Sequence, residues 1–344
     1  MRKILCALLI SGLACLLTAC HTAEKTRYEA EFLRLFDTVT KVIGYADSKE
    51  EFSTFVQDLY DELEAYHRLY DIYNEYEGVN NIRTVNENAG IRPVEVDKRI
   101  IDLLKLGVEA YDLSDGQVNI AMGSVLRLWH DYRVAGTSDP SRATLPSMEV
   151  LQEADRHTDI EAVIIDEEAG TVFLTDPAMS LDVGGIAKGY ATEQVVLHAI
   201  ERGFTDGVVS VGGNVRAFGS KGRPGTPWGI GIQSPVAGEP DLFSVHIQDR
   251  SVVSSGGHSR YYTVDGQQYH HIIDPTTLMP ADYFDLVTIV CEDSGMADIL
   301  STMVFNMPFE QGLAAIEAIE DTEAVWVLKD GSIAYSSGFE ALID

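Results

Sequence analysis

The segment from Asp182 to Ala191 reads Asp-Val-Gly-Gly-Ile-Ala-Lys-Gly-Tyr-Ala and joins a carboxylate, glycines and a lysine. A strand is predicted over residues 179–182 and a helix over residues 186–201, with the paired glycines between them. Backbone N–H groups at a helix N-terminus attract phosphate, and glycine lets a ligand approach the backbone closely. Lys188 adds a positive charge. The spacing fits neither a Gly-x-Gly-x-x-Gly fingerprint nor a Walker P-loop. The segment therefore predicts either an anion site of another kind or a tight turn that needs small residues.

Two adjacent histidines precede an Asp-Pro pair in the segment from Tyr269 to Pro275. Histidine exchanges a proton near neutral pH, which suits a general base. Asp274 follows His271 by three residues and could orient the imidazole or balance its charge. A histidine at the end of a strand is also often structural, so both interpretations stay open.

A carboxylate and a hydroxyl are spaced four residues apart in a helix predicted over residues 295–305. This spacing places Asp298 and Thr302 on one helix face, with Ser301 beside them. Oxygen ligands of this kind suit magnesium. Water molecules or substrate phosphates would fill the remaining coordination positions of the ion. The alternative is a polar stripe on a surface helix, but the neighbouring residues are apolar and a buried carboxylate needs a partner. The sequence has no Cys and His cluster with the spacing of a zinc site.

The pair Gly212-Gly213 follows a strand predicted over residues 207–211 and precedes Asn214. Glycines at this place indicate a simple strand-end turn, or a point where the backbone closely approaches another group. Taken together, the four segments suggest a phosphate, a divalent metal and a proton-accepting histidine in one pocket. That combination is suited to breaking a phosphoanhydride bond, or to transferring a group from it.

The elements that must position these segments are a mixture of helices and short strands. Further helices are predicted over residues 51–70, 98–111 and 309–319, and a loop over residues 136–140. Strands are also predicted over residues 33–46, 162–165, 171–174, 228–233, 242–247, 251–254, 261–264, 324–328 and 332–335. Several of them are joined by tight turns such as Val-Asp-Gly-Gln at residues 264–267, which favours antiparallel hairpins. We therefore expect an α+β fold and not a doubly wound parallel sheet.

The N-terminus has the pattern of an export signal. A short basic start is followed by almost wholly apolar residues 4–17, a stretch too short for a stable transmembrane helix. Leu-Thr-Ala-Cys at residues 17–20 resembles a bacterial lipobox. Residues 1–19 are therefore expected to be removed as a signal peptide and Cys20 to carry lipid. The alternative is a plain signal peptide that happens to end at Cys20.

Residues 20–30 are expected to form a polar tether, and residues 31–344 a single globular domain. Apart from the lipidated residue, the mature chain would keep only Cys291, which leaves no internal disulfide to form. The whole chain carries 25 Lys and Arg against 54 Asp and Glu, a net charge of −29. That balance argues against binding nucleic acid and against adsorption to anionic lipid, so membrane attachment would rest on the lipid at Cys20.

The order of these segments resembles that of the FAD:protein FMN transferase (ApbE) family, from about Phe36 to the last predicted strand. The matching blocks are Asp182 to Ala191, Gly212-Gly213-Asn214, Ser255-Gly256, His271-Ile272-Ile273-Asp274-Pro275, and Ala297-Asp298 with Ser301-Thr302. The resemblance implies a single T-fold-like α+β domain of antiparallel sheets packed with helices. It also implies an enzyme that splits FAD and transfers FMN to a threonine, or sometimes a serine, hydroxyl of an acceptor protein. Such a reaction needs Mg2+ and releases AMP.

The resemblance also assigns roles to individual residues. Magnesium would be held by the backbone carbonyl of Gly185 and by the side chains of Asp298 and Thr302. His271 would accept the proton of the acceptor hydroxyl, with Asp274 holding its imidazole. The residues that would contact FAD are Phe36, Tyr73, Gln117, Val118, Asn119, Asp182, Lys188, His271 and Ile272.

Two segments depart from the commoner wording of the family. Phe36-Asp37-Thr38 stands where many members have Met-Gly-Thr, and residues 71–76 also differ. The second departure leaves open whether Tyr73 or Tyr76 is the aromatic residue that stacks on FAD.

The expected location is the outer face of the bacterial cytoplasmic membrane, and the expected acceptor is an outward-facing redox flavoprotein of that membrane. Three alternatives remain at this point: an FAD pyrophosphatase that gives AMP and FMN, a lipoprotein that binds FAD without turning it over, and a solute-binding lipoprotein for another ligand. A flavin redox enzyme is disfavoured because the chain lacks a dinucleotide fingerprint and a redox cysteine pair.

Overall fold

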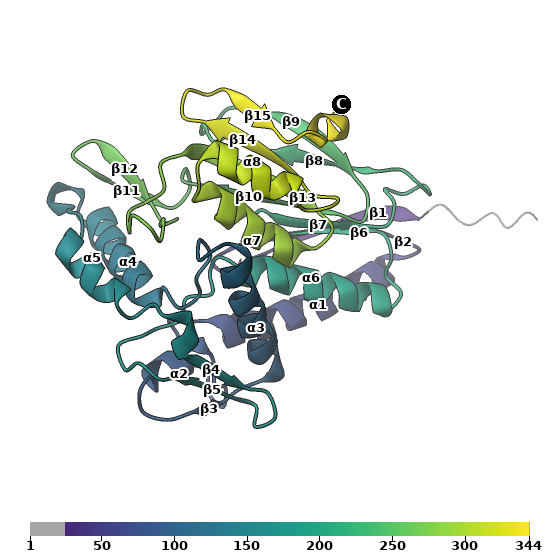
Figure 1. Ribbon diagram of the computed structural model, residues 1–344. Helices are drawn as coiled ribbons and strands as arrows, with labels where there is room; N and C mark the ends of the chain where they lie inside the picture. Colours follow the sequence, from purple (N-terminus) through teal and green to yellow (C-terminus); the bar gives the residue numbers. More distant parts are fainter. Residues whose placement is uncertain (1–24, 344) are drawn as a thin grey trace, which may run out of the picture.

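The computed structural model describes residues 25–343 and is built around one antiparallel sheet (Figure 1). Eight strands form it, in the order β1-β2-β6-β7-β10-β13-β14-β15. Every neighbouring pair in this order runs antiparallel. Sheets of this kind can present different chemistry on their two faces, because successive side chains point to opposite sides.

The strands are β1 (Thr26–Leu35), β2 (Thr38–Ala46), β3 (Val94–Glu95), β4 (Val163–Asp166), β5 (Thr171–Leu174), β6 (Gly207–Val211), β7 (Asn214–Phe218), β8 (Trp228–Ile232), β9 (Phe243–Ile247), β10 (Ser251–Gly256), β11 (Tyr261–Val264), β12 (Gln267–His270), β13 (Phe284–Cys291), β14 (Glu323–Leu328) and β15 (Ile333–Tyr335). The α-helices are α1 (Lys49–Tyr70), α2 (Ile82–Glu87), α3 (Lys98–Leu113), α4 (Gly123–Ser138), α5 (Met148–Asp155), α6 (Ala187–Glu201), α7 (Ser294–Phe305) and α8 (Phe309–Glu317).

Helices α1, α6 and α7 cover one face of the large sheet (Figure 1). Helix α1 begins at Ser48, whose hydroxyl accepts a hydrogen bond from the backbone N–H of Glu51 at 3.1 Å. Its apolar residues recur every three or four positions and form a single buried stripe: Phe52, Phe55, Leu59, Leu63, Tyr66, Leu69 and Tyr70. This stripe fixes α1 against the sheet and against α6.

The opposite face of the sheet is covered in part by the separate β8–β9 hairpin (Figure 1). Trp228 and Val245 of this hairpin pack with Val252 and Leu286 of the large sheet in a second apolar cluster. The two faces of the sheet therefore belong to two different cores, one beneath the helices and one beneath the hairpin.

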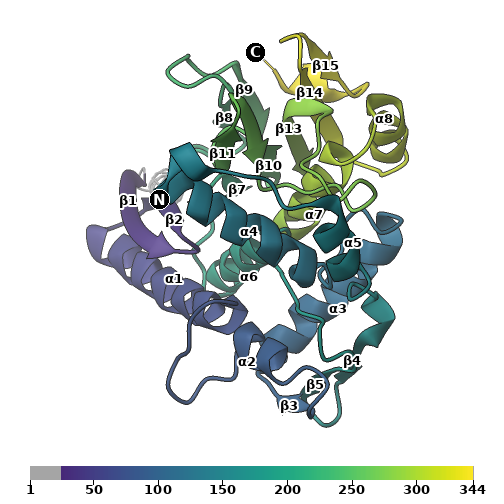
Figure 2. The same ribbon diagram turned by 90° about the vertical axis from the view of Figure 1, so that its left-hand side faces the viewer.

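Two smaller assemblies complete the fold (Figure 2). Strands β3, β5 and β4 form a short sheet next to α2 and α3. Helices α4 and α5 pack with the β11–β12 hairpin around a third apolar cluster. In that cluster the indole N–H of Trp129 donates to the carbonyl of Leu278 at 2.9 Å. The α4 assembly and the helix-covered face of the sheet leave a cavity between them, described below.

The expected α+β fold with antiparallel sheets is confirmed. The tight turn at residues 264–267 joins β11 to β12, with Asp265 and Gly266 both at positive φ. The long helix expected at residues 51–70, and those at 98–111, 186–201, 295–305 and 309–319, are present with ends that differ by a few residues. The hydrophobic spacing sufficed for these elements because each buries one continuous face.

Several local predictions are wrong. Residues 179–182 make only an isolated bridge, through Ser180, and residues 136–138 continue helix α4, which the sequence analysis did not predict. The expected tether over residues 20–30 is contradicted from Thr26 onward, because β1 pairs with β2 as an edge strand. Polar residues at such an edge resemble a tether in sequence because one side of the strand faces solvent.

The single strand expected over residues 33–46 is a hairpin instead. Its turn lies at Phe36 and Asp37, whose φ values are 52° and 53°. Such a pair of left-handed residues suits the twist of an antiparallel hairpin. Aspartate adopts this conformation readily, whereas it is unusual for a bulky residue such as Phe36.

The expected signal peptide over residues 1–19 and the lipid site at Cys20 lie outside the described residues. No helix within residues 25–343 is long and apolar enough to cross a membrane.

Candidate active site

A cavity of about 990 Å³ opens between the helix-covered face of the large sheet and the α4 assembly. Its lining brings together nearly all residues that the sequence analysis placed at the site: Phe36, Tyr73, Gln117, Val118, Asn119, Asp182, Gly185, Lys188, His271, Ile272, Asp298 and Thr302. Asp274 is the exception. The volume lies in the range typical of sites for cofactors and other small molecules.

The glycine-containing segment forms the cavity wall at the start of α6. Asp182 accepts a hydrogen bond from the backbone N–H of Gly184 at 2.8 Å, which closes a tight turn. Ile186 is the N-cap residue of α6 and offers no side-chain cap, so the first N–H groups of the helix depend on other acceptors. An anion in the cavity would meet this helix end and the ammonium group of Lys188 together.

Helix α7 supplies the oxygen atoms that face this wall. Oδ2 of Asp298 accepts from the backbone N–H of Gly189 at 2.8 Å and lies 3.8 Å from Nζ of Lys188. A Cβ atom built on Gly185 would lie 3.8 Å from Oγ1 of Thr302, so the two residues face each other across the turn. A side chain on Gly189 would collide with the Ser294 carbonyl and with Asp298, which explains why glycine stands there.

These residues fit a magnesium ion by the chemistry of their donors. The hydrogen bonds of the described residues leave Oδ1 of Asp298 and Oγ1 of Thr302 without a protein partner. Both are hard oxygen ligands, and the backbone carbonyl of Gly185 is a third. Residues 25–343 contain no group of three or more His, Cys, Asp or Glu side chains placed to hold a metal. A site with one carboxylate suits magnesium better than zinc, since magnesium commonly keeps waters and substrate phosphates as ligands.

Ser301 is not part of this ligand set. Its hydroxyl is fully buried, donates to the backbone carbonyl of Asp298 at 3.0 Å and lies 2.8 Å from the hydroxyl of Ser255. It therefore attaches α7 to strand β10 and does not reach the cavity.

His271 lines the cavity in its neutral form. Burial, together with the positive charges of Arg260 and Arg133, lowers the pKa of His271 to about 3. Its Nδ1 atom is buried and has no hydrogen-bond partner. A neutral imidazole can accept a proton, and a bound anionic ligand would raise its pKa by offsetting the nearby cations.

The expected contact between Asp274 and His271 is absent. Asp274 is buried, and its Oδ1 atom accepts from the backbone N–H of Thr276 at 2.8 Å. Its main chain also bonds to Leu278 and Met279. Asp274 therefore stabilises the turn after His271, and a catalytic role for it is not supported. The spacing of three residues was misleading because the Asp274 carboxylate is used by the turn that follows it, where it accepts from Thr276, and not by the imidazole.

The structure distinguishes between the two candidate tyrosines. Tyr73 lines the cavity with 51% of its surface exposed, and its ring lies 4.9 Å from that of His130, centroid to centroid. Tyr76 instead donates its hydroxyl to Asp71 at 2.7 Å and lies outside the lining of the cavity. Tyr73 is thus the aromatic residue available to a ligand.

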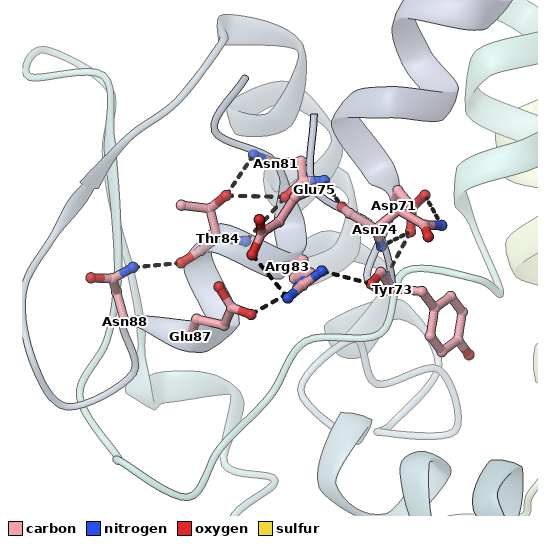
Figure 3. A network of polar contacts seen from close by, with 9 residues as sticks. All are labelled: Asp71, Tyr73, Asn74, Glu75, Asn81, Arg83, Thr84, Glu87 and Asn88. Atoms are coloured by element: carbon pink, nitrogen blue, oxygen red, sulfur yellow. Dashed lines mark hydrogen bonds and ion pairs between the residues drawn. The ribbon is translucent and has the colours of Figure 1, made fainter. Parts of the chain in front are cut away.

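A polar network holds the main chain of Tyr73 in place (Figure 3). The carboxylate of Asp71 accepts from the backbone N–H groups of Tyr73, at 2.6 Å, and Asn74, at 3.0 Å. The guanidinium group of Arg83 donates to the carbonyl of Tyr73 at 3.0 Å and pairs with two glutamates. Burial alone would raise the pKa of Asp71. The hydrogen bonds that its carboxylate accepts from Asn74, Tyr73 and Tyr76 outweigh burial, lower the pKa and keep Asp71 ionised.

The segment Gln117-Val118-Asn119 lines the cavity, and Gln117 has the side chain that is left available to a ligand. The Asn119 amide is used internally, with Ala121 and Thr158 as partners. Oε1 of Gln117 and Oδ1 of the neighbouring Asn306 are buried without partners. Buried polar atoms without a protein partner at a cavity wall are positions where a ligand can bind.

Sequence reasoning missed several residues that line the cavity: His130 and Arg133 of α4, Arg260 before β11, and Asn306 at the end of α7. The two arginines add positive charge to a lining that also contains Asp37, Asp71, Asp182 and Asp298. Helix α4 has no strong apolar period, so nothing in its sequence indicated that it forms a wall. Asn306 lies four residues after Thr302, and that spacing was the available signal.

Comparison with known proteins gives a consistent result. The ApbE family model matches residues 36–326. An FAD:protein FMN transferase of Klebsiella pneumoniae is 33% identical over 279 residues, which are 78% of this chain and 84% of that protein. An FAD:protein FMN transferase of Treponema pallidum is 31% identical over 273 residues, covering 75% and 73% of the two chains.

Solved structures resemble the fold over most of its length. The crystal structure of an ApbE protein from Thermotoga maritima superimposes with a TM-score of 0.79, at 27% identity, and covers 93% of this chain and all of that one. The flavin transferase ApbE from Vibrio cholerae gives a TM-score of 0.75 at 23% identity, with 92% of this chain covered.

Proposed function

Because this chain belongs to the ApbE family, we propose that it is an FAD:protein FMN transferase. In the proposed reaction it uses magnesium, transfers FMN from FAD to a threonine or serine hydroxyl of an acceptor flavoprotein, and releases AMP. The family resemblance noted in the sequence is confirmed, and with it the assignment to transferases.

The observation that carries this proposal is the meeting of three kinds of group in one cavity. Unpartnered oxygens of Asp298 and Thr302, the ammonium group of Lys188 at the start of α6, and the neutral imidazole of His271 all line it. A protein that only stores FAD needs no hard oxygen ligands beside an anion site. A dinucleotide with a pyrophosphate uses all three groups.

The chemistry divides among the residues as follows. A bound magnesium ion would supply positive charge that offsets the charge developing on the pyrophosphate. The ammonium group and the backbone N–H of Lys188, at the start of α6, hold the phosphates and stabilise the departing AMP. The acceptor oxygen forms a bond to the phosphorus of the FMN half, and the bond from that phosphorus to the AMP oxygen breaks. The hydroxyl proton passes to His271, which is neutral and ready to accept it.

The test measures products of the mature protein solubilised in detergent. It is incubated with FAD, with and without magnesium, and AMP and FMN are followed by chromatography. A parallel reaction adds an acceptor domain with a target threonine, beside a version in which alanine replaces that threonine. Fluorescent acceptor that forms only with magnesium and threonine supports the proposal. AMP and free FMN with an unlabelled acceptor would make the protein an FAD pyrophosphatase, and intact FAD throughout would make it a binding protein.

His271→Ala tests the assignment of the base. We expect transfer to be abolished while FAD still binds, because the imidazole acts on the acceptor hydroxyl. Asp274→Asn is the matched comparison. It should leave transfer within a few-fold of the wild type, since Asp274 has no contact with the imidazole. A loss of FAD binding in His271→Ala would instead make His271 a binding residue.

We also propose that the protein is exported and attached to the outer face of the cytoplasmic membrane through lipid on Cys20. The apolar residues 4–17 and the Leu-Thr-Ala-Cys sequence support this location. Labelling cells with a radioactive fatty acid should mark the wild-type protein and not Cys20→Ser. Label in both proteins would refute lipidation at Cys20.

A further inference from the structure

The cavity extends to both faces of the large sheet. Strand pairing places Lys41 beside Ser210, Ser210 beside Val215, and Val215 beside Val252. Paired residues of neighbouring strands share a face, so these four form one row across β2, β6, β7 and β10. All four line the cavity.

The row on the other face lies one residue along each strand. It consists of Thr40, Val211, Asn214 and Val253, paired in the same order. This second row faces the helices, because Val211 and Val253 belong to the core beneath α6 and α7. The row that begins with Lys41 therefore faces away from the helices.

The turn at Gly212 and Gly213 connects the two sides. It closes the β6–β7 hairpin directly after the pair Val211 and Asn214, and both glycines line the cavity. A side chain on Gly212 would collide with Thr38, so the hairpin end stays compact. The cavity passes around this compact end and continues on the far face of the sheet.

On the far face the cavity becomes a groove with a polar floor. We define the far-face groove as Lys41, Ser210, Ser254, Ile230, Gly231 and Gln233. Lys41, Ser254 and Gln233 are exposed, and Ile230 and Gly231 of strand β8 form the wall. None of the residues that the family resemblance assigns to FAD or to the metal lies in this groove. Those residues come from α6, α7, the β1–β2 turn and the loops that face the helix side.

We propose that the far-face groove binds an extended, acidic segment of the acceptor flavoprotein and leads its hydroxyl residue around the Gly212-Gly213 turn to His271. This inference rests on the proposed function, which requires a second, macromolecular substrate to reach the same cavity. A groove that is continuous with the cavity, and that FAD does not need, provides that route.

Charge indicates the kind of segment. The chain as a whole has a net charge of −29, which repels acidic partners from most of its surface. Lys41 stands at the start of the groove, and its Nζ atom is ion-paired at 3.8 Å with Glu31. Both side chains are exposed, so solvent screens this pair and a carboxylate of a bound segment can replace Glu31. The hydroxyl of Ser210 and the amide of Gln233 can bond to the main chain of an extended peptide, whereas the hydroxyl of Ser254 already pairs with that of Thr288 at 2.8 Å.

The experiment blocks the groove in the full mature protein. Ser254→Trp fills the floor at an exposed position, and Ser53→Trp makes the same change on the exposed side of α1, away from the cavity. The probe is a purified acceptor domain with a target threonine, scored for covalent flavin. We expect Ser254→Trp to lower kcat/KM for the acceptor at least about tenfold by excluding the peptide, with the Kd for FAD unchanged and Ser53→Trp like the wild type.

Lys41→Glu tests the charge. We expect the KM for the acceptor to rise about tenfold, because repulsion replaces attraction at the entrance of the groove. In the wild type that KM should increase with salt, and in Lys41→Gln it should be nearly independent of salt. Melting temperatures of the Lys41 and Ser53 variants should match the wild type, since these residues are exposed. Ser254→Trp also removes the hydrogen bond between the hydroxyls of Ser254 and the buried Thr288, so its melting temperature should fall while its Kd for FAD stays unchanged.

Three outcomes would overturn the docking proposal. Equal acceptor kinetics in Ser254→Trp and Ser53→Trp would show that the acceptor enters elsewhere. A weaker Kd for FAD in Ser254→Trp would assign the groove to FAD itself. A KM that is insensitive to Lys41→Glu and to salt would exclude an acidic segment. An unlabelled acceptor with the wild-type protein would instead contradict the proposed function, so the two failures are distinguishable.

Discussion

The two ends of helix α7 differ in how their polar groups are satisfied. Near its N-terminus, Oε2 of Glu193 accepts from the backbone N–H of Ser294 at 2.7 Å, and Oδ2 of Asp298 accepts from that of Gly189 at 2.8 Å. At its C-terminus, three atoms of cavity-lining residues are buried and unpaired: Oδ1 of Asn306, Oε1 of Gln117 and Nδ1 of His271. The hydroxyl of Ser294 at the N-terminal end is also unpaired, but Ser294 does not line the cavity.

The N-terminal end is held by two contacts that lie one turn apart on both helices. Glu193 follows Gly189 by four residues on α6, and Ser294 precedes Asp298 by four on α7. Arg216 of β7 donates to both oxygens of Glu193, at 3.2 and 3.0 Å, and the pair is almost fully buried. A slip of α7 along α6 would break both contacts at once and move the proposed metal ligands away from Gly185.

The difference suggests that the N-terminal part of α7 positions the metal ligands and that its C-terminal end binds substrate. A metal site needs oxygen atoms fixed within narrow limits, and buried charged contacts supply that rigidity. A substrate must supply the missing partners of unpaired groups, so those groups contribute little to the free protein and act when ligand binds. Each prediction below tests one side of this comparison.

The largest effect should come from Asp298→Asn. The amide can still accept from Gly189, but it removes the negative charge that would hold magnesium. We expect transfer to fall by about 1,000-fold, equivalent to about 4 kcal/mol of transition-state stabilisation. The measurement pairs AMP release with manganese binding by electron paramagnetic resonance in the presence of FAD. Manganese affinity equal to that of the wild type would show that the metal binds elsewhere.

Glu193→Gln should destabilise the whole fold. It leaves the Arg216 guanidinium buried without a charged partner, which is expected to lower the free energy of unfolding by about 3 kcal/mol. Urea titration measures this loss. Glu64→Gln, which breaks the exposed pair between Glu64 and Arg68, is the comparison and should cost less than about 1 kcal/mol.

A double variant, Glu193→Met with Arg216→Met, separates rigidity from stability. Apolar replacements of a buried ion pair often restore stability. We expect the double variant to recover much of the unfolding free energy and still bind manganese more weakly than the wild type. Full recovery of metal affinity would show that the ion pair does not position α7.

His271 predicts a pH effect on stability at the other end of α7. The folded protein keeps this imidazole neutral, with its pKa lowered to about 3, whereas the unfolded chain takes up a proton below about 6.5. Acid therefore favours unfolding through this group, progressively from pH 6.5 down toward 3. Relative to His271→Asn, the wild type should lose up to about 2 kcal/mol between pH 6.5 and 5. Parallel curves for the two proteins would contradict a buried neutral imidazole.

The smallest effect concerns the aromatic residue at the cavity. Asp71→Asn removes the charge that organises the backbone around Tyr73, and we expect the KM for FAD to rise about fivefold with little change in kcat. The comparison is Glu87→Gln, at the exposed edge of the same network (Figure 3), which should leave both constants unchanged. A drop in kcat alone would place the effect in the chemical step.

Many residues of the site could be predicted from the sequence because they lie in short, chemically specific segments. Lys188, Asp298 and Thr302 were named from charge and helical spacing, Asp182 and Gly185 from the family resemblance, and the structure gathers all five in one cavity. The α+β class followed from tight turns and short strands. These features are local: helix faces and turn residues depend on neighbours within a few positions.

Tertiary structure alone decided the features that depend on distant partners. The sequence does not decide between Tyr73 and Tyr76, whereas the structure places Tyr73 in the cavity and bonds the hydroxyl of Tyr76 to Asp71. Asp274 lies close to His271 along the chain, yet a turn directs it elsewhere. The cavity wall from α4 and the groove on the far face arise from packing between segments more than a hundred residues apart. Their positions depend on which surfaces bury one another, and spacing along the chain carries no information about that choice.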